Sequence, residues 1–313
     1  MRVTNNWLVA SAMRNLNRLR ADSTKAEQQV STGLAFTKMS ENVVGGSEVL
    51  KLQHRLGQLD TWGEQQNDAL QWLQTSEQHL TDMSDSLARL QELALQARNA
   101  AMEGNRADIA KEAQEIGNHL LELLNGRNGD KALFGGFQTQ ADPFAMNWTT
   151  GTLAYNGDTG KLMRDVGPNT TLAANISGDQ LASFSYVDAG GTTQTGDMVN
   201  TVFRLINDMI PTAPPAGAPV DNPPQDDTMA RLDAAFNQVN ALRTQVGTRH
   251  QRITQLESKL GDTYLYLQSA MSNAQGADPA KAILELEQAS TAYKAALAVS
   301  GRTLPVTLAD FLR

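Results

Sequence analysis

The histidines are the residues of this sequence best suited to acid–base or metal chemistry, and they are scattered along the chain. The four are His54, His79, His119 and His250. Metal sites on helices usually pair histidines at short, fixed spacings or join them to a carboxylate cluster, and none of the four lies in such a pattern. We therefore interpret the histidines as structural residues and predict no metal site.

Other catalytic patterns are also missing from the sequence. It holds no G-x-S-x-G nucleophile turn, no phosphate-binding G-x-x-x-x-G-K loop and no G-x-G-x-x-G fingerprint. It has no cysteine, which excludes disulfide bonds and thiolate catalysis. The stretch Asn156-Gly157-Asp158-Thr159-Gly160 has some features of a calcium loop, but it lacks the distal glutamate and the full spacing of oxygen ligands, so a β-turn is expected. We predict no catalytic residue and no cofactor, and we expect that the protein is not an enzyme.

The composition favours long helices and argues against a nucleic-acid partner. Only 5% of the 313 residues are aromatic, and the formal charge is −8, whereas binding to phosphates needs a basic surface. Residues 1–38 are the exception, with six basic against two acidic side chains. We interpret this segment as a solvated helix face, with a membrane-surface or partner signal as the alternative. The apolar run near the N-terminus is too short for a secretory signal or a membrane span.

Apolar residues recur in alternating steps of three and four, which is typical of helices in a bundle or coiled coil. A first helix is expected to end at Gly33, and Ser47 is expected to cap a long helix over 49–103. A further helix should end at Asn125-Gly126. The seam of the long helix is weak at Gln66, where we expect looser packing.

Residues 127–196 lose this periodicity and predict a small strand-rich insert. The expected strand pieces are Ala132–Phe134, Leu153–Tyr155, Leu162–Val166, Thr171–Ile176 and Phe184–Val187. Asp197 is a candidate cap for a short helix that stops before Pro211. Residues 211–224 hold six of the ten prolines, which predicts a stiff linker. The apolar seam returns after it, and the Gly276-Ala277-Asp278-Pro279 break separates the last helix.

These patterns predict a mainly α fold with a small β-rich insert: an elongated rod of long antiparallel coiled-coil or bundle helices, with the N- and C-terminal helices paired. The expected segments are an N-terminal assembly helix (1–38), the first half of a helical rod (39–126), the insert with its short helix (127–210), the linker (211–226), the second half of the rod (227–275) and a C-terminal assembly helix (276–313).

The two terminal helices carry more apolar surface than their mutual contact can cover. The excess favours burial by other copies or by related subunits, although an ordinary pair with alanines as good helix formers is the alternative. The residues expected to take part in assembly are Trp7, Val9, Met13, Leu16, Leu19, Ala26 and Val30 in the first helix, and Ile283, Leu286, Tyr293, Leu297, Leu304, Leu308, Phe311 and Leu312 in the last.

Both ends of the chain resemble the bacterial flagellin superfamily. Ser31-Thr32-Gly33-Leu34 is similar to its S-[ST]-G-L signature, and residues 277–313 are similar to its C-terminal segment. The middle resembles the hook-filament junction branch of that superfamily, whose F-x-G-[YF]-x-T…P-F, Y-x-G-D and N-x-x-G elements match 134–144, 155–158 and 175–178.

The resemblance implies a structural protein of the extracellular flagellum, self-assembling into a ring through its terminal helices after type III export with an uncleaved N-terminal signal. The implied partners are other copies of the chain, hook-associated protein 1, flagellin, a flagellar export chaperone and the type III export apparatus. Membrane insertion and nucleic-acid binding are not implied. A filament-forming flagellin is one alternative, and a cytoplasmic coiled-coil scaffold is an alternative from another class.

Overall fold

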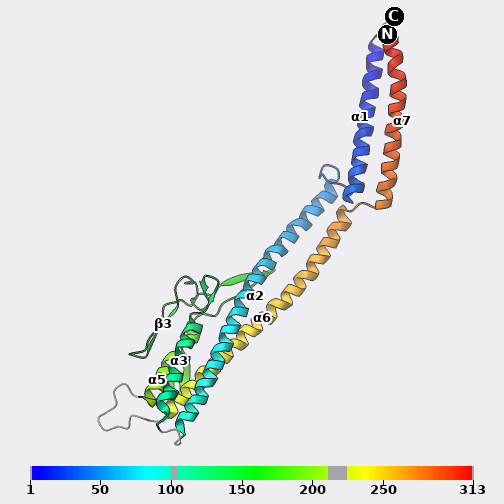
Figure 1. Ribbon diagram of the computed structural model, residues 1–313. Coiled ribbons are helices and arrows are strands. Elements are labelled where there is room, and N and C mark those ends of the chain that lie inside the picture. The colour runs from blue at the N-terminus through cyan, green and yellow to red at the C-terminus, as the bar shows by residue number, and fades with distance from the viewer. Residues whose placement is uncertain (1, 100–103, 211–223, 312–313) are drawn as a thin grey trace. The chain divides into compact units, whose positions relative to one another are not determined.

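The computed structural model describes residues 2–99, 104–210 and 224–311 and consists mainly of helices (Figure 1). The helices are α1 (Arg2–Thr32), α2 (Val43–Arg98), α3 (Arg106–Leu124), α4 (Asp179–Ala182), α5 (Met198–Met209), α6 (Asp226–Gln275) and α7 (Pro279–Phe311). The strands are β1 (Arg127–Asn128), β2 (Lys131–Ala132), β3 (Phe144–Asn147), β4 (Thr152–Tyr155), β5 (Met163–Gly167), β6 (Thr170–Ala173), β7 (Phe184–Val187) and β8 (Thr193–Gly196). The predicted fold class, mainly α with a β-rich insert, is confirmed.

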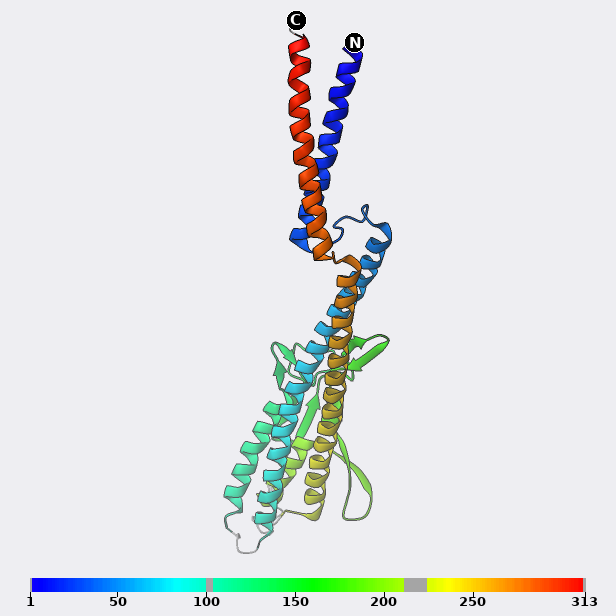
Figure 2. The same ribbon diagram turned by 90° about the vertical axis from the view of Figure 1, so that its right-hand side faces the viewer.

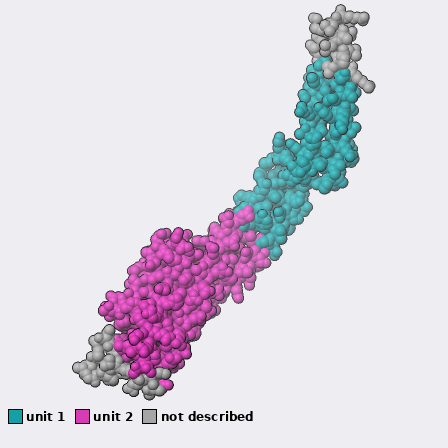
Figure 3. Space-filling view, viewed as in Figure 1, with its two compact units in different colours: residues 1–59, 261–313 teal, residues 60–260 magenta. Residues whose placement is uncertain are grey.

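The chain divides into two compact units, coloured separately in Figure 3. Unit 1 comprises residues 1–59 and 261–313, and unit 2 comprises residues 60–260. Helices α2 and α6 contribute residues to both units. The predicted linker, 211–226, lies largely outside the described residues.

In unit 1 the first and last helices pair, as the sequence predicts. Helices α1 and α7 run side by side in opposite directions, so that the start of α1 and the end of α7 lie at the same end of the pair (Figures 1 and 2). Gly33 ends α1 with a backbone φ of 70°, a left-handed conformation that glycine adopts without strain. Residues 276–278 are not helical and separate α6 from α7, as the sequence predicts.

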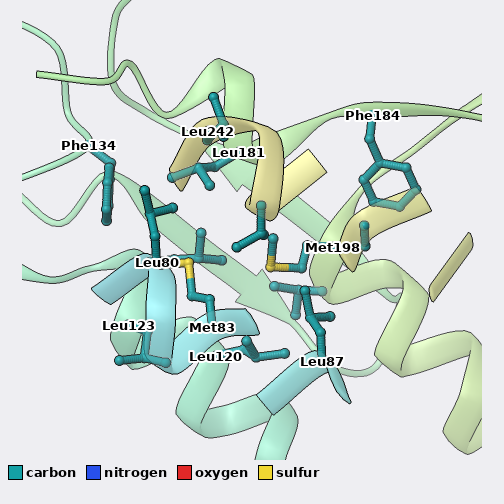
Figure 4. Packing of buried hydrophobic residues seen from close by; sticks show 14 of the residues in the cluster. Leu80, Met83, Leu87, Leu120, Leu123, Phe134, Leu181, Phe184, Met198 and Leu242 are labelled. Carbon is teal, nitrogen blue, oxygen red and sulfur yellow. The ribbon is translucent and has the colours of Figure 1, made fainter. Parts of the chain in front are cut away.

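The core of unit 2 is built on the seams of its long helices. On α2 the fully buried residues Leu73, Leu80, Met83, Leu87 and Leu90 follow the predicted steps of three and four, with one such position skipped between Leu73 and Leu80. Figure 4 shows Leu80, Met83 and Leu87 in this core. On α6 the residues Leu232, Val239, Val246 and Ile253 are all fully buried, and a constant step of seven keeps them on one face of the helix. Helix α3 packs against α5 in the same unit, and both add residues to this core.

The insert consists of four separate antiparallel hairpins, β1–β2, β3–β4, β5–β6 and β7–β8. Each strand pairs with its neighbour in the sequence, so the contacts are local. All five predicted strand pieces overlap an observed strand, while β1, β3 and β8 were not expected. Asp197 caps α5 as predicted, because its Oδ1 accepts a hydrogen bond from the Asn200 amide at 2.5 Å.

Two local expectations about α2 are wrong. The helix begins at Val43, so Ser47 lies inside its first turns and cannot cap it; Asn42 takes that role, with its Oδ1 accepting from the Gly45 amide at 2.9 Å. Gln66 does not mark loose packing. It is 1% exposed, and its Nε2 donates to the Val166 carbonyl at 2.6 Å, because strand β5 packs on α2 at this point.

Candidate assembly surface

Small side chains line the seam between α1 and α7. Ser23 and Ala26 on α1, and Ala282 and Ser300 on α7, are the most buried residues of the described part of these two helices. Ala282 and Ser300 are eighteen residues apart, which is five helical turns, so they lie on the same face. Alanine and serine let two helix backbones approach closely, and larger half-buried side chains such as Leu16 and Tyr293 complete the seam.

Large apolar side chains remain exposed around this seam. Trp7 is 65% exposed on α1, and Leu297 and Val299 are 52% and 62% exposed on α7. Ile283 and Leu284 are exposed as well, and a step of about 100° per residue directs these two neighbours to different sides of the helix. Helix α7 is therefore apolar on several faces, which is the pattern of a helix buried on several sides.

The predicted assembly residues divide into two groups. Those that are buried or partly buried are Val9, Leu16, Leu19, Ala26, Leu286 and Tyr293. Those left exposed are Trp7, Met13, Val30, Ile283 and Leu297. The side chains of Leu304, Leu308 and Phe311, and all of Leu312, lie outside the described residues. The predicted set of assembly residues does not include Leu284 and Val299. A search for apolar residues outside the predicted seam of this helix would have found both.

An elbow, defined here as residues 33–36 together with 275–277, links the helix pair to α2 and α6 within unit 1. The Ala35 amide donates to the Gln275 carbonyl at 2.7 Å, and the Ala277 amide donates to the Gly33 carbonyl at 2.8 Å. The Gln275 side chain also donates to the Phe36 carbonyl at 3.2 Å. Two chain segments that are about 240 residues apart in the sequence are thus tied together at the base of the helix pair.

Phe36 fixes the elbow against the start of α2. Its ring is 6% exposed and lies over Gly45, where an added Cβ would stand 3.0 Å from two ring carbons and 2.7 Å from Asn42 Nδ2. Glycine is required at this position because any side chain would displace the ring or the cap of α2. The glycine inside the first turn of α2 is therefore explained by packing.

In unit 2 the three short motifs of the insert meet in one loop cluster, defined as residues 133–139, 155–160 and 175–178. The Asp158 amide donates to the Gly135 carbonyl at 3.2 Å, and the Gly178 amide donates to the Phe134 carbonyl at 2.8 Å. Asn175 Nδ2 donates to the Gly160 carbonyl at 3.0 Å. Segments that are weak motifs one by one therefore form a single structure.

Tyr155 and glycine residues close the centre of the loop cluster. The Tyr155 hydroxyl lies 2.7 Å from the Asp158 carbonyl and accepts from the Gly178 amide at 3.2 Å; partial burial raises its pKa. A Cβ on Gly178 would lie 2.5 Å from the Tyr155 ring, and a Cβ on Gly136, whose φ is 70°, would overlap Asp158 Oδ1.

The Asp158 loop holds backbone amides where a calcium loop would hold an ion. Asp158 Oδ1 accepts from the amides of Phe137 and Gly160 at 2.8 and 2.7 Å. Within the described ranges, no group of three or more His, Cys, Asp or Glu residues could hold a metal ion. The turn expected at 156–160 is therefore a structural element.

The histidines have no common site. His79 packs edge-on to Phe134, with ring centroids 6.5 Å apart, and burial lowers its pKa although Asp82 acts in the opposite direction. His54 and His119 are exposed, and His250 is partly buried on α6. No described helix is long and apolar enough to cross a bilayer.

The sequence matches two family models that together span about two thirds of the chain. The bacterial flagellin N-terminal helical region matches residues 3–138, and the bacterial flagellin C-terminal helical region matches residues 229–304. The chain is 24% identical over 281 residues to flagellar hook-associated protein 3 of Salmonella typhimurium, covering 87% of both chains. It is 23% identical over 308 residues to flagellin of Bacillus subtilis, covering 94% of this chain and 95% of that one.

Solved structures show the same fold. A putative flagellar hook-associated protein from Vibrio parahaemolyticus superposes with a TM-score of 0.62 at 18% identity, covering 75% of this chain and all of that one. The flagellar junction protein from Legionella pneumophila superposes with a TM-score of 0.58 at 16% identity, covering 74% of this chain and all of that one.

Proposed function

The chain belongs to the bacterial flagellin family, and on this premise we propose that it is a structural adaptor of the flagellum, joining the hook to the flagellin filament. The relative named hook-associated protein 3 supports this position, because the match covers 87% of both chains. The location is the extracellular flagellum. The family and the fold are those of structural flagellar proteins, and the role proposed here involves no catalysis.

The observation that carries a self-assembling role is the uncovered apolar surface of the α1–α7 pair. Large apolar side chains, among them Trp7, Leu284 and Leu297, stay exposed after the two helices have paired. Fully burying an exposed side chain of this size stabilises an assembly by roughly 1.5–3 kcal/mol. Because these three are already partly covered, burying what remains exposed contributes roughly 3–5 kcal/mol in all, which is near the lower end of the estimated 4–15 kcal/mol that association costs in lost freedom of motion. One contact between two copies would therefore be weak, and a ring in which each copy contacts two neighbours is favoured.

The proposed partners follow from this position in the flagellum. The chain would contact other copies of itself, hook-associated protein 1 on the hook side and flagellin on the filament side. It would reach this place through the type III export apparatus, with an export chaperone and without cleavage of its N-terminus. The elbow supports the use of α1 and α7 as one assembling element, because its hydrogen bonds join the segment that follows α1 to the segment that precedes α7.

A filament-forming flagellin is the second candidate function. The match to Bacillus subtilis flagellin favours it, since it covers 94% of this chain. The loop cluster favours the junction role, because it joins all three of the motifs that resemble the junction branch. A cytoplasmic coiled-coil scaffold, the third candidate, would leave the protein inside the cell.

Electron microscopy of flagella labelled with an antibody to this chain separates the three candidates. We expect label at the base of the filament, next to the hook. Label along the whole filament would establish the flagellin role, and absence of the chain from sheared flagella would contradict both flagellar roles. A chain lacking residues 301–313 should be exported but fail to join the flagellum, and normal swimming of such cells would contradict assembly through the C-terminal helix.

A further inference from the structure

Asparagine followed by glycine is the dipeptide in which spontaneous deamidation is easiest, and this chain contains it three times. The three sites are Asn125-Gly126, Asn128-Gly129 and Asn156-Gly157. In this reaction the glycine amide nitrogen attacks the asparagine side chain, and glycine favours the attack because it has no Cβ to block the approach. In a folded protein the two reacting groups must also be free of other contacts. The surroundings of the three sites therefore set their relative reactivity.

Both reacting groups are occupied at Asn125-Gly126. Asn125 Nδ2 donates to the Phe144 carbonyl at 2.9 Å, and Asn125 Oδ1 accepts from the Phe144 amide at 2.9 Å. The Gly126 amide donates to the Leu123 carbonyl at 3.0 Å. Gly126 is also buried against the His79 ring, which an added Cβ would approach to 2.5 Å. Because these hydrogen bonds must open before the attack can occur, the fold protects this site.

Strand pairing restrains Asn128-Gly129. Asn128 is the last residue of β1 and lies opposite Lys131 of β2, with Gly129 in the two-residue turn between them. The cyclic imide that deamidation forms requires the asparagine backbone to leave the strand conformation, since the side-chain carbonyl carbon must reach the next amide nitrogen. The hairpin opposes this movement, and Asn128 is also partly buried. We therefore expect slow reaction at this site.

Asn156-Gly157 has neither restraint. Asn156 is exposed and lies between strands β4 and β5, outside both. Among the described residues, neither the Asn156 side chain nor the Gly157 amide has a hydrogen-bond partner. The Asn156 amide donates to the Pro143 carbonyl at 2.7 Å, but this amide takes no part in the reaction. The attacking nitrogen and the side chain that it attacks are thus both available at this site.

We propose that Asn156-Gly157 is a site of spontaneous deamidation and that its isoaspartate product opens the loop cluster. The Gly157 nitrogen forms a bond to Asn156 Cγ while the Cγ–Nδ2 bond breaks, and Nδ2 leaves as ammonia with the proton of the glycine amide. Water then opens the five-membered imide at either carbonyl, which gives aspartate or isoaspartate. One water is consumed and one ammonia is released, without an oxidant or a reductant. Each converted copy carries one more negative charge at neutral pH.

The main chain is anchored on both sides of the reacting bond. The Asn156 amide is held by the Pro143 carbonyl, and the Asp158 amide donates to the Gly135 carbonyl at 3.2 Å. Isoaspartate directs the main chain through the side-chain carbon, which adds one atom, or about 1.5 Å, between positions 156 and 157. Hydrogen bonds weaken steeply away from their normal geometry, so we expect at least one anchor to break. The Asp158 carboxylate, which accepts from two further amides of the loop cluster, would shift with it.

Ageing of the purified full-length chain tests the proposal, because trypsin places the three sites in separate peptides. It cuts after lysine and arginine, so the sites fall in residues 112–127, 128–131 and 132–161. The folded chain is kept at mildly alkaline pH, digested at intervals and analysed by mass spectrometry with fragmentation that distinguishes aspartate from isoaspartate. We expect Asn156 to convert first, and Asn125 at least about tenfold more slowly, since its hydrogen bonds must open. In urea, which unfolds the chain, the three sites should react at similar rates.

Two variants separate the reaction from its effect on the loop cluster. Asn156→Gln slows ring closure, because the imide would need a six-membered ring, and freshly prepared Asn156→Asp carries the new charge on an unaltered main chain. Both should match the fresh natural chain in their urea midpoint, since the Asn156 side chain is exposed and makes no hydrogen bond within the described residues. After ageing, the midpoint of the natural chain should fall and that of Asn156→Gln should hold.

Each contrary result overturns a stated part of the proposal. Conversion of Asn125 or Asn128 ahead of Asn156 in the folded chain, or no conversion at all, would overturn the assignment of the site. The same ratio of rates in the folded chain and in urea would show that the fold does not select the site. Conversion of Asn156 with an unchanged urea midpoint would overturn the opening of the loop cluster. The reaction is independent of the proposed function, which labelled flagella test separately.

Discussion

The amide of Ala277 donates a hydrogen bond to the carbonyl oxygen of Gly33, which joins the start of the C-terminal helix to the end of the N-terminal one. The bond is 2.8 Å long and is matched by a second one between Ala35 and Gln275. Together they close the base of the α1–α7 pair. The pair is therefore built by contacts at its base as well as along its seam.

Replacing Gly33 with alanine is expected to loosen this base. The φ of Gly33 is 70°, a left-handed conformation that costs a residue with a Cβ roughly 1–2 kcal/mol, although nothing lies within 4 Å of the added atom. The amides of Ala35 and Ala277 should then exchange their hydrogens faster. The control is Gly57→Ala, at a helical position that is also open, where we expect stabilisation by roughly 0.5–1 kcal/mol. Equal exchange in the natural chain and in the Gly33 variant would contradict a role for the elbow.

Gly136→Ala is expected to disrupt the loop cluster. The added Cβ would overlap Asp158 Oδ1, which accepts two amide hydrogen bonds, and the positive φ adds strain of its own. We expect a loss of at least about 3 kcal/mol in the free energy of urea unfolding, from strain together with broken hydrogen bonds. Gly129→Ala serves as control. It has a φ of 59° with open space around it, so only the backbone cost of about 1–2 kcal/mol applies. Similar losses for both variants would show that the packing against Asp158 has no effect.

Gln66→Leu tests the docking of strand β5 on helix α2. The substitution removes the donor to the Val166 carbonyl and leaves that buried oxygen without its partner, which costs about 1–3 kcal/mol. Gln74→Leu, at an exposed position of the same helix, should change the unfolding free energy by no more than about 0.5 kcal/mol. If leucine at position 66 stabilises the protein, apolar packing outweighs the hydrogen bond and our explanation of the buried glutamine is wrong.

His79 predicts a decrease in stability at mildly acid pH. Burial lowers its pKa in the folded protein below the ordinary value of 6.5, so the unfolded chain binds the proton more readily. Its contribution to stability is complete above pH 6.5 and is lost as the pH falls through the folded pKa. The urea midpoint should therefore drop between pH 7.5 and 5.5, and by less in His79→Gln. The exposed His54→Gln should keep the full drop, and an equal drop in all three proteins would exclude His79 as the cause.

The sequence predicts the helices well because their signals are local and repeated. The seven-residue step from Leu232 to Ile253 and the break before Pro279 each specify an element without help from distant parts of the chain. The sequence prediction placed the start of α2 too late. Gly45 and Gly46 resemble a connector between helices, but Asn42 caps the helix ahead of them. A side chain at position 45 would collide with the Phe36 ring, a constraint that no sequence pattern shows.

The candidate sites are less predictable because their contacts are distant in sequence. The terminal seam follows from periodicity, and residues such as Leu16 and Tyr293 do lie along it. The exposure of Trp7 depends on which face the partner helix covers, and the burial of Ala26 and Ala282 that marks this face appears only in the structure. The loop cluster depends on bonds such as that between the Gly178 amide and the Phe134 carbonyl, which join motifs that are separately weak.

Leu284→Glu should block assembly and leave the fold of the free chain intact. Leu284 is 53% exposed and lies about 200° around α7 from the buried Ala282, so a carboxylate there stays in water in the single molecule. In an assembly that covers this face, the same carboxylate would be buried without a partner, which costs several kcal/mol. The unfolding midpoint of the free chain should be unchanged, while cells making the variant should release flagellin into the medium and lose swimming. Thr291→Glu places the same charge on the same side of α7, seven residues further along, and should also impair swimming if the covered face extends that far. The control is Lys281→Glu, which places the same carboxylate near the start of the helix, where the natural side chain is already charged and exposed. This variant should leave swimming intact. Normal swimming with Leu284→Glu would show that no partner covers this face, and the terminal helices would then assemble through the α1 side alone.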